Sequence, residues 1–459
     1  MNVQFEMFKN MIAGKRVALV GLGVSNLPLV PFLADLGAVM SCCDKREEDE
    51  FDSETLQMLR SHAVQLHLGG RYLDFLNGQD LIIKSPGLRP DLPQFLEAVQ
   101  NGASLTSEME LFFNVCPAPI IGVTGSDGKT TTTTLIYEML KKQGYKCWVG
   151  GNIGNPLLHQ ADQIEPEDFV VLELSSFQLQ TMHISPQVAV ITNIAPNHLD
   201  WHTSFEEYIQ AKTNIFRYQD RNCLLVINAD NKITAELGKS AAAQVLQFSV
   251  KKKVRHGAYL QDGVLYFGQQ AVLQRSEILL PGMHNVENYL AAICAVSHLV
   301  DKISIRNVAE TFTGVEHRME FVREFRGVKF YNDSIASSPS RTIAGLKSYD
   351  QKVILIAGGY DKKIPYDPLG PAVKEHVKAL LLLGATGNKF RRVVENSYRQ
   401  DEDIIPILQG KDMEYMVRSA LALAREGDIV ILSPASASFD QFKNFEERGN
   451  LFKKIVNSL

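Results

Sequence analysis

"IIGVTGSDGKTT", residues 120–131, combines an apolar run, a glycine-rich turn and a lysine followed by threonines. The apolar run predicts a buried strand, and residues 129–143 predict a helix that ends at Gly144. A turn between a strand and a helix N-terminus offers free backbone N–H groups and a positive helix end, so a phosphate can bind there. Lys129 would add a positive charge, and the Thr130 hydroxyl could bind Mg²⁺. The stretch therefore predicts a nucleotide-phosphate site, and the alternative is an ordinary strand–turn–helix with a chance lysine.

This turn departs from the standard phosphate-loop pattern. The pattern G-x-x-x-x-G-K-[ST] needs a glycine where the chain has Val123, five residues before Gly128. Asp127 is an awkward residue beside an anion, and we expect its carboxylate to point away from the phosphates. The prediction of a nucleotide-phosphate site therefore depends on the strand and the helix on either side of the turn, and not on a match to the standard pattern.

Apolar β-branched runs alternate with helical patterns along nearly the whole chain, which indicates an α/β fold with mostly parallel sheets. A chain of 459 residues is too long for one core, so we expect three domains, 1–107, 108–314 and 315–459. The expected strands lie in residues 16–23, 39–44, 80–87, 119–125, 170–176, 188–194, 223–230, 328–334, 352–359, 377–385 and 428–435.

The composition excludes several classes of protein. A formal net charge of −5 argues against a general nucleic-acid binder. No apolar run approaches the roughly 20 residues of a membrane helix, and the N-terminus lacks the pattern of a signal peptide. The six cysteines form no C-x-x-C pair, which favours reduced thiols in a cytosol over disulfides or a zinc site. We expect a cytoplasmic protein with neither nucleic acid nor membrane as a partner.

The first domain carries a second glycine turn, "GLGVSN", residues 21–26. Asn26 stands where the dinucleotide fingerprint has its third glycine, which disfavours an NAD-dependent redox enzyme. A related fold that binds another nucleotide at its strand ends remains open.

Polar residues also interrupt two apolar strands of the central segment. Glu173 lies inside the run 170–176, where a carboxylate needs a cation, a metal or strong donors. His198, Asp200 and His202 follow the next strand, on the edge where parallel sheets bind ligands. We expect Thr130, Glu173 and His198 to hold magnesium, whereas Asp200 and His202 could equally be structural.

Lys212 lies on the apolar stripe of a helix predicted within TSFEEYIQAKTNIFRY, residues 203–218. The helix opens with a capping box from Ser204 to Glu207, and the stripe comprises Phe205, Tyr208, Ile209, Ile215 and Phe216. The ammonium either extends along the stripe to water or faces an active site, with or without chemical modification.

These residues and several longer motifs resemble the Mur ligases, the ATP-dependent amide-bond-forming enzymes of peptidoglycan assembly. The resemblance covers essentially the whole chain. The C-terminal stretch 433–449 resembles the D-glutamate-adding branch in particular. The matching motifs are TGSDGKTT (124–131), GNIG (151–154), LELSSFQL (172–179), NHLDWH (197–202), AKTNIF (211–216), GMHNVENYLAA (282–292), HRME (317–320), NDS (332–334) and SPASASFDQFKNFEERG (433–449).

The resemblance implies a Rossmann-like first domain that binds the UDP-sugar, a P-loop ATPase-like central domain and a Rossmann-like third domain that binds an amino acid. It implies an acyl phosphate intermediate, ATP, two magnesium ions and a carbamate on Lys212. The implied substrates are UDP-N-acetylmuramoyl-L-alanine and D-glutamate, and the expected state is a monomer.

The implied catalytic residues are Lys129, Glu173, His198 and Lys212, and the implied metal ligands are Thr130, Glu173, His198 and carbamylated Lys212. The implied ATP-binding residues are Gly125, Ser126, Asp127, Gly128, Lys129, Thr130, Thr131, Asn285, Asn288, Arg318 and Asp333. The implied UDP-substrate residues are Val24, Ser25, Asp44, Lys45, Arg46, Ser85, Gly87, Asn152 and His198. The implied amino-acid-binding residues are Ser337, Lys362, Ser438 and Phe445.

One position departs from the D-glutamate branch, which usually has a lysine where this chain has Ile335. Either Lys362 or Lys363 compensates, or the acceptor amino acid differs. Asn197, where an aspartate is common, is a milder change. The other readings are a folylpolyglutamate synthetase, a P-loop ATPase that acts on a partner, and a nucleotide-sugar-binding protein without catalysis.

Overall fold

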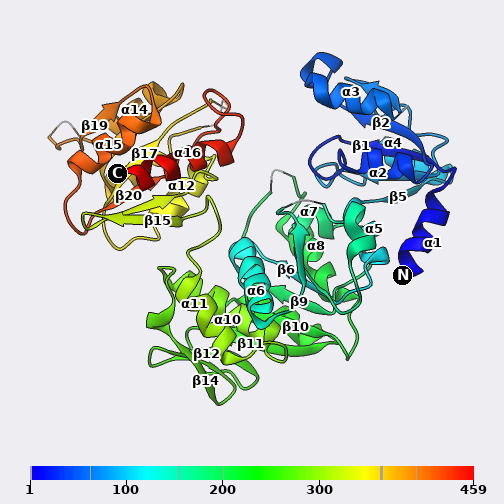
Figure 1. Ribbon diagram of the computed structural model, residues 1–459, viewed down its shortest axis with the longest axis horizontal. Coiled ribbons are helices and arrows are strands. Elements are labelled where there is room, and N and C mark those ends of the chain that lie inside the picture. Colours follow the sequence, from blue (N-terminus) through cyan, green and yellow to red (C-terminus); the bar gives the residue numbers. More distant parts are fainter. Residues whose placement is uncertain (1–2, 63, 155, 200, 362–364, 400) are drawn as a thin grey trace. The chain divides into compact units, whose positions relative to one another are not determined.

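The computed structural model describes residues 3–459 except 63, 155, 200, 362–364 and 400. The described chain contains three β-sheets, each flanked by helices (Figure 1). It divides into two compact units, Met1–Glu277 with His284–Ala309, and Ile278–Met283 with Glu310–Leu459. The first unit contains two of the sheets and the second unit contains the third. The predicted α/β architecture is confirmed, while the boundaries at 107 and 314 stay predictions.

The first sheet is parallel, in the order β3-β2-β1-β4-β5. Its elements are α1 (Val3–Ile12), β1 (Arg16–Val20), α2 (Leu29–Asp35), β2 (Val39–Asp44), a 3₁₀ turn η1 (Glu48–Glu50), α3 (Ser53–Ser61), β3 (Gln65–Leu68), β4 (Leu81–Lys84), α4 (Pro93–Gln100) and β5 (Ser104–Thr106). The strand order reverses between β1 and β4, and open α/β sheets bind ligands at that point. The loops that follow these strands touch, because a Cβ built on Gly21 would lie 2.8 Å from the Cβ of Ser85.

The second sheet has the order β14-β13-β12-β11-β10-β9-β6-β8-β7. Its elements are α5 (Glu108–Val115), β6 (Ile120–Thr124), α6 (Lys129–Gln143), β7 (Cys147–Gly151), η2 (Leu158–Gln163), β8 (Phe169–Glu173), α7 (Ser176–Leu179), β9 (Val188–Ile191), α8 (Phe205–Arg217), β10 (Leu224–Asn228), α9 (Lys232–Leu237), η3 (Gly238–Ser240), β11 (Gln244–Ser249), β12 (Gly257–Gln261), β13 (Val264–Phe267), β14 (Gln270–Gln274), η4 (Arg275–Glu277), α10 (Met283–Val296) and α11 (Lys302–Thr311). The strands from β7 to β12 are parallel, and β13 and β14 add an antiparallel edge.

The third sheet has the order β15-β16-β20-β17-β18-β19 and is parallel except for the β15–β16 pair. Its elements are β15 (Glu320–Phe325), β16 (Val328–Asn332), α12 (Pro339–Leu346), β17 (Val353–Ala357), α13 (Leu369–His376), β18 (Val377–Leu382), α14 (Gly387–Glu395), β19 (Ile407–Gln409), α15 (Met413–Leu423), β20 (Ile429–Leu432) and α16 (Phe445–Ser458).

One apolar cluster joins the first two sheets. It runs from Phe5 and Phe8 of α1 and the strands of the first sheet, through Phe112 of α5, into the strands of the second sheet. Apolar burial on this scale is the main stabilising term in folding, so α1 and α5 hold the two sheets together within the first unit.

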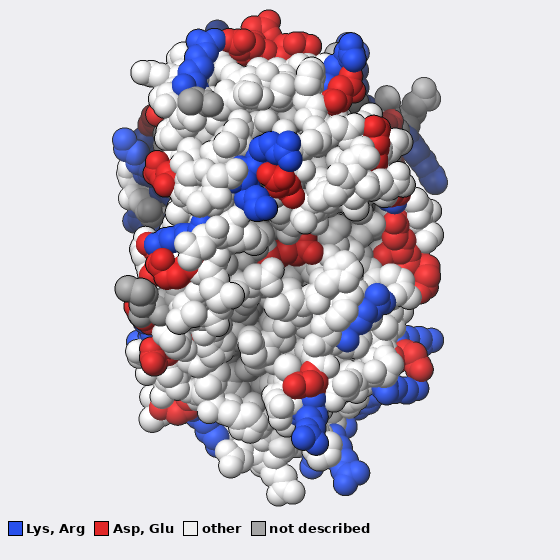
Figure 2. Space-filling model, turned by 90° about the vertical axis from the view of Figure 1, so that its right-hand side faces the viewer, with Lys and Arg blue, Asp and Glu red and all other residues white. Residues whose placement is uncertain are grey.

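Charged side chains of both signs are interspersed on the face shown in Figure 2. This mixture follows from the composition, in which 47 Lys and Arg residues nearly balance 52 Asp and Glu residues. Among the described residues, none of the helices has the length and apolar character needed to cross a bilayer.

Glu108, the first residue of α5, is a buried acid that should reduce stability at alkaline pH. Its Oε1 accepts the Leu158 N–H at 3.2 Å, and burial raises the pKa of this carboxyl to about 7. A raised pKa means that the folded state binds the proton more tightly, so ionisation costs stability as the pH rises from about 4.5 through 7. Glu108→Gln stays neutral and should gain up to roughly 3 kcal/mol at pH 8.5.

Thermal unfolding at pH 5 and pH 8.5 measures this gain. The melting temperature of Glu108→Gln should exceed that of the wild type at pH 8.5 and match it more closely at pH 5. Glu167→Gln, at an exposed position, is the matched control. An equal shift at both pH values would contradict a raised pKa.

Candidate active site

The glycine turn has the predicted position between β6 and α6. Gly128 is the N-cap of α6 with φ +77°, and Gly125 has φ +152°. A side chain at either position would collide with a neighbour, Thr192 Oγ1 at Gly125 and Asn288 Oδ1 at Gly128. The two glycines are therefore required by conformation and by close packing, and the turn leads directly into the N-terminus of a 15-residue helix.

Contacts from the segment after β9 hold this turn in place. The Ser126 hydroxyl donates to the Ala195 carbonyl and accepts the Ala195 N–H, both at 2.9 Å. The Asp127 N–H donates to Asn193 Oδ1 at 3.0 Å, while the Asp127 side chain is exposed. The backbone of the turn is therefore fixed before any ligand binds.

Thr130 and Glu173 meet at the edge of the sheet, as predicted from their strand ends. The Thr130 hydroxyl donates to Glu173 Oε2 at 2.7 Å, and Asn152 Nδ2 donates to Glu173 Oε1 at 2.8 Å. Because β8 lies beside both β6 and β7, the three residues converge from the C-terminal side of neighbouring elements. The buried Glu173 carboxylate thus accepts from two neutral donors, and its oxygens and the Thr130 hydroxyl are the kind of oxygen ligand that suits Mg²⁺.

The Lys129 ammonium folds back over the turn. Its Nζ donates to the Gly125 carbonyl at 3.1 Å and to the Ser126 carbonyl at 3.0 Å. The Lys129 ammonium is therefore held beside the N-terminus of α6, and the ammonium and the helix end both favour binding of an anion there.

Lys212 is buried, so the alternative in which it extends to water is wrong. Its side chain is 1% exposed, and its Nζ donates to the Gly125 carbonyl at 2.8 Å and to Thr124 Oγ1 at 3.2 Å. The Tyr208 ring lies 4.8 Å from the ammonium, and the Tyr208 hydroxyl shares a 2.9 Å hydrogen bond with Ser126. Burial, and then the charge of Lys129, lower the pKa of Lys212 well below the usual 10.5. A buried lysine with a lowered pKa therefore lies against the glycine turn.

The two histidines after β9 have different surroundings. His198 is exposed, has φ +54°, and its ring lies edge-on to Phe177 at 4.9 Å between centroids. His202 is buried, stacks on Phe177 and shares a 2.9 Å hydrogen bond with the Ser176 hydroxyl. Burial lowers the pKa of His202, which favours the neutral form of this ring. Asp200 lies outside the described residues.

The start of α8 satisfies half of the predicted capping box. Ser204 is the N-cap and its hydroxyl accepts the Glu207 N–H at 3.1 Å. The Glu207 carboxylate, which a capping box directs at the N-cap N–H, instead accepts from Thr203 and from Arg89.

Two asparagines of α10 lie beside the turn, although they are about 160 residues away in sequence. Asn288 Oδ1 lies against Gly128 and accepts from the Thr132 hydroxyl at 3.2 Å. Asn288 in turn donates to Asn285 Oδ1 at 3.2 Å. The implied nucleotide residues of the first unit therefore adjoin the loop.

At the end of the first sheet, Asp44 organises the loops around the switch point. Its Oδ2 accepts the Leu22 N–H at 2.6 Å, and Arg46 Nη2 lies 2.9 Å from the same oxygen. Burial alone would raise the pKa of Asp44, but the hydrogen bonds from Arg46 and Leu22 outweigh it and lower that pKa. Ser85 contacts Gly21 from the next loop. The remaining implied residues here are exposed or half-buried on the same loops: Val24, Ser25, Lys45 and Gly87.

In the second unit, strained backbone flanks Arg318. His317 has φ +62° and Met319 has φ +47°. The Met319 N–H donates to Asp333 Oδ1 at 3.3 Å, and the Ser433 hydroxyl donates to Asp333 Oδ2 at 2.7 Å. Burial raises the pKa of Asp333 to about 7, against the lowering effect of Ser433 and Arg318.

The residues implied for the acceptor amino acid lie near a buried arginine to which the sequence analysis assigned no role. Arg448 of α16 is 1% exposed and donates to the Ser334 hydroxyl and carbonyl and to the carbonyls of Ser436 and Ala437. This guanidinium joins the loops that carry the implied residues Ser337, Ser438 and Phe445. Lys362 and Lys363 lie outside the described residues. The sequence did not predict this burial, because Arg448 is a basic residue in a helix with an amphipathic pattern, where such a residue is usually exposed.

Comparisons with known proteins identify Mur ligase domains in all three parts of the chain. Residues 15–107 match the family "Mur ligase MurD-like, N-terminal domain", residues 123–296 the "Mur ligase middle domain", and residues 317–436 the "Mur ligase, glutamate ligase domain". A UDP-N-acetylmuramoylalanine–D-glutamate ligase of Acetivibrio thermocellus is 55% identical over 465 residues, which cover 100% of both chains. A ligase of the same name from Clostridium kluyveri is 53% identical over 459 residues, again covering 100% of both.

Solved structures share the fold. A UDP-N-acetylmuramate–alanine ligase from Thermotoga maritima matches 97% of this chain and 99% of its own, with a TM-score of 0.60 and 19% identity. A pseudomurein peptide ligase type C from Methanothermus fervidus matches 97% of this chain and 100% of its own, with a TM-score of 0.54 and 18% identity.

Proposed function

The chain belongs to the Mur ligase family, and from this we propose that it is the ATP-dependent ligase that joins D-glutamate to UDP-N-acetylmuramoyl-L-alanine. The observation that carries the proposal is the identity of more than half of all residues, over the full length, with ligases of that name. The same assignment makes it an enzyme of peptidoglycan precursor synthesis, which we place in the cytoplasm.

The reaction explains the kinds of residue that the site contains. An oxygen of the alanine carboxylate attacks the γ-phosphorus of ATP, and ADP leaves, which gives an acyl phosphate. The amine of D-glutamate then attacks the acyl carbon, and inorganic phosphate leaves as the amide forms. Both steps bring anions together, so positive charge must be in place beforehand. Lys129 and the N-terminus of α6 supply it at the γ-phosphate end.

The proposal assigns magnesium to Thr130, Glu173 and His198. The fit rests on the 2.7 Å contact between the Thr130 hydroxyl and the buried Glu173 carboxylate, which are hard oxygen ligands. Bound magnesium would offset phosphate charge. Glu173 is oriented by Asn152, so its second oxygen stays directed at Thr130.

Lys212 fits a carbamate because burial favours its neutral amine. A neutral amine can attack CO₂ and lose a proton, which turns a cation into an anionic oxygen ligand. The buried position beside the Gly125 carbonyl and the lowered pKa both favour that state.

The remaining assignments follow the loops on which the residues lie. We assign the phosphates of ATP to the turn from Gly125 to Thr131, and the rest of the nucleotide to Asn285, Asn288, Arg318 and Asp333. We assign the UDP end of the substrate to the loops of the first sheet, and we assign its muramoyl-alanine tail to Asn152 and His198. Ser337, Ser438, Phe445 and Lys362 are assigned to D-glutamate. Arg341 donates to the Ile335 carbonyl at 3.3 Å, so a guanidinium lies next to the position where the branch usually has a lysine.

A phosphate-release assay tests the proposal. ATP hydrolysis in the presence of UDP-N-acetylmuramoyl-L-alanine should require D-glutamate, and the ligated product should appear in equal amount by mass spectrometry. L-Glutamate, L-lysine and meso-diaminopimelate should release little phosphate. Phosphate release without any amino acid would instead indicate an ATPase, and ligation to a folate substrate would indicate a folylpolyglutamate synthetase.

A further inference from the structure

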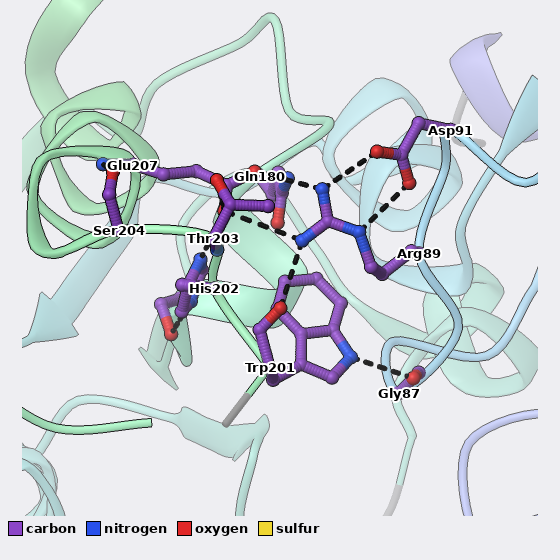
Figure 3. A network of polar contacts seen from close by, with 10 residues as sticks. Gly87, Arg89, Asp91, Gln180, Trp201, His202, Thr203, Ser204 and Glu207 are labelled. Atoms are coloured by element: carbon purple, nitrogen blue, oxygen red, sulfur yellow. Dashed lines mark hydrogen bonds and ion pairs between the residues drawn. The ribbon is translucent and has the colours of Figure 1, made fainter. Parts of the chain in front are cut away.

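Arg89, Trp201 and Glu207 form a contact between the first two sheets, which we name the Arg89 clasp (Figure 3). Arg89 follows β4, Trp201 lies between β9 and α8, and Glu207 lies in the first turn of α8. In sequence, Arg89 is 118 residues from Glu207. The clasp therefore joins a loop of the UDP-substrate side to the part of the chain that carries His198 and Lys212.

The guanidinium of Arg89 bridges three partners. Its Nη2 donates to Glu207 Oε1 at 3.1 Å and to Asp91 Oδ2 at 2.7 Å. Its Nη1 donates to the Trp201 carbonyl at 2.9 Å. Figure 3 shows Arg89 between Asp91 on one side and Thr203, Glu207 and the Trp201 backbone on the other. Its side chain is 23% exposed, which leaves these charged hydrogen bonds partly shielded from water.

Trp201 makes the second link between the same two loops. Its indole N–H donates to the Gly87 carbonyl at 2.9 Å, and its ring lies 5.3 Å from the Arg89 guanidinium. Gly87 belongs to the segment proposed to hold the UDP end. Any movement of that segment on binding a ligand acts directly on Trp201.

On the other side, the clasp reaches the residues proposed for catalysis. The N–H groups of Trp201 and His202 both donate to the His198 carbonyl, at 3.2 and 3.0 Å, so Trp201 closes the turn that presents His198. Glu207 also accepts from Gln180 at 3.1 Å, which ties α8 to the segment after α7. Lys212 lies on α8 itself, slightly more than one turn beyond Glu207.

We propose that the Arg89 clasp couples the occupancy of the UDP-substrate loop to the placement of His198 and Lys212, with Arg89 as a positioning residue. The inference rests on the proposed function, because it takes the ligand at Gly87 to be the UDP-linked substrate. Without the clasp, that substrate would bind a loop that no longer fixes the turn and helix on which catalysis depends.

Kinetics test the coupling. Arg89→Met keeps the length of the side chain and removes its charge and donors. We expect kcat to fall at least tenfold, while the KM for D-glutamate changes less than twofold. Arg89→Lys should recover only part of kcat, because one ammonium cannot serve both the Trp201 carbonyl and Glu207. Arg71→Met is the matched control, since Arg71 lies in the same domain, is 86% exposed and forms an ion pair with Asp74, three residues away.

A double-mutant cycle separates the clasp from general damage. If Arg89 acts through Glu207, Arg89→Met and Glu207→Gln together should lower kcat about as much as either alone. Losses that multiply would contradict the coupling. Melting temperatures of all variants establish that each is folded under assay conditions.

Tryptophan fluorescence supplies a direct readout. The chain has two tryptophans, Trp148 and Trp201, so Trp148→Phe leaves Trp201 as the sole reporter. Adding UDP-N-acetylmuramoyl-L-alanine to Trp148→Phe should shift the emission of Trp201, and the added change Arg89→Met should at least halve that shift.

The outcomes distinguish the two proposals. If the wild type ligates D-glutamate but Arg89→Met has the kinetics of Arg71→Met, or Trp201 emission does not respond to saturating substrate, the clasp is refuted and the function stands. If the wild type does not ligate at all, the proposed function falls and the clasp falls with it.

Discussion

Lys129→Ala should lower the turnover of ATP by about a hundredfold to a thousandfold, the usual loss when one charge-stabilising group is removed from an active site. In the structure, its ammonium bridges the carbonyls of Gly125 and Ser126 at the entrance to α6. Alanine leaves the helix N-terminus in place but removes the only charge in the turn that attracts phosphate, since the neighbouring Asp127 repels it. Stability should change little, because alanine is the better helix former and Lys129 is half-buried.

Steady-state phosphate release, together with the melting temperature, measures this result. Lys142→Ala, at an exposed position in the last turn of the same helix, is the control and should keep wild-type turnover. If Lys129→Ala turned over ATP within twofold of the wild type, the turn would be a structural feature and the nucleotide site would have to lie elsewhere.

The parts of this site that could be predicted lie at the ends of neighbouring strands. The apolar runs around Glu173 and the turn around Lys129 identify strands, and parallel strands bring their C-terminal ends to one edge. The strand assignments and the rule that parallel strands end at one edge therefore predicted Thr130 and Glu173 at one site, and the Thr130 hydroxyl lies 2.7 Å from Glu173 Oε2. The sequence did not decide whether Lys212 is buried, because a lysine on the apolar stripe of a helix can either extend its ammonium to water or bury it.

Contacts that depend on packing between sheets could not be predicted. Arg89 and Glu207 are both charged residues in ordinary polar surroundings, and only the joining of the two sheets through α1 and α5 makes them partners. The same partnership explains why the predicted capping box is half formed, since Arg89 and Thr203 hold the Glu207 carboxylate. Arg448 was missed because its burial depends on the convergence of two loops that are about 100 residues apart in sequence but follow the neighbouring strands β16 and β20.

Lys212→Arg should be nearly inactive, with turnover lowered by at least about a hundredfold, although it conserves charge. Its side chain is buried against Thr124 at the end of β6, Gly125 of the turn and the Tyr208 ring. The lowered pKa of Lys212 favours its neutral amine, whereas a guanidinium stays protonated and should not form a carbamate. The variant would thus keep a cation at the position for which the proposed chemistry needs an anionic oxygen beside magnesium.

Two measurements separate loss of the carbamate from simple misfit of the larger side chain. Lys212→Ala leaves a cavity in which formate or acetate can supply the missing carboxylate oxygens, so these ions should restore part of its turnover while chloride should not. In the wild type with ¹³C-labelled bicarbonate, a carbamate carbon resonance should appear, and it should be missing in Lys212→Arg. Wild-type turnover by Lys212→Arg, or a wild type that shows no such resonance while active, would mean that the buried lysine works as an amine hydrogen-bonded to Gly125 and that the metal site has one ligand fewer than proposed.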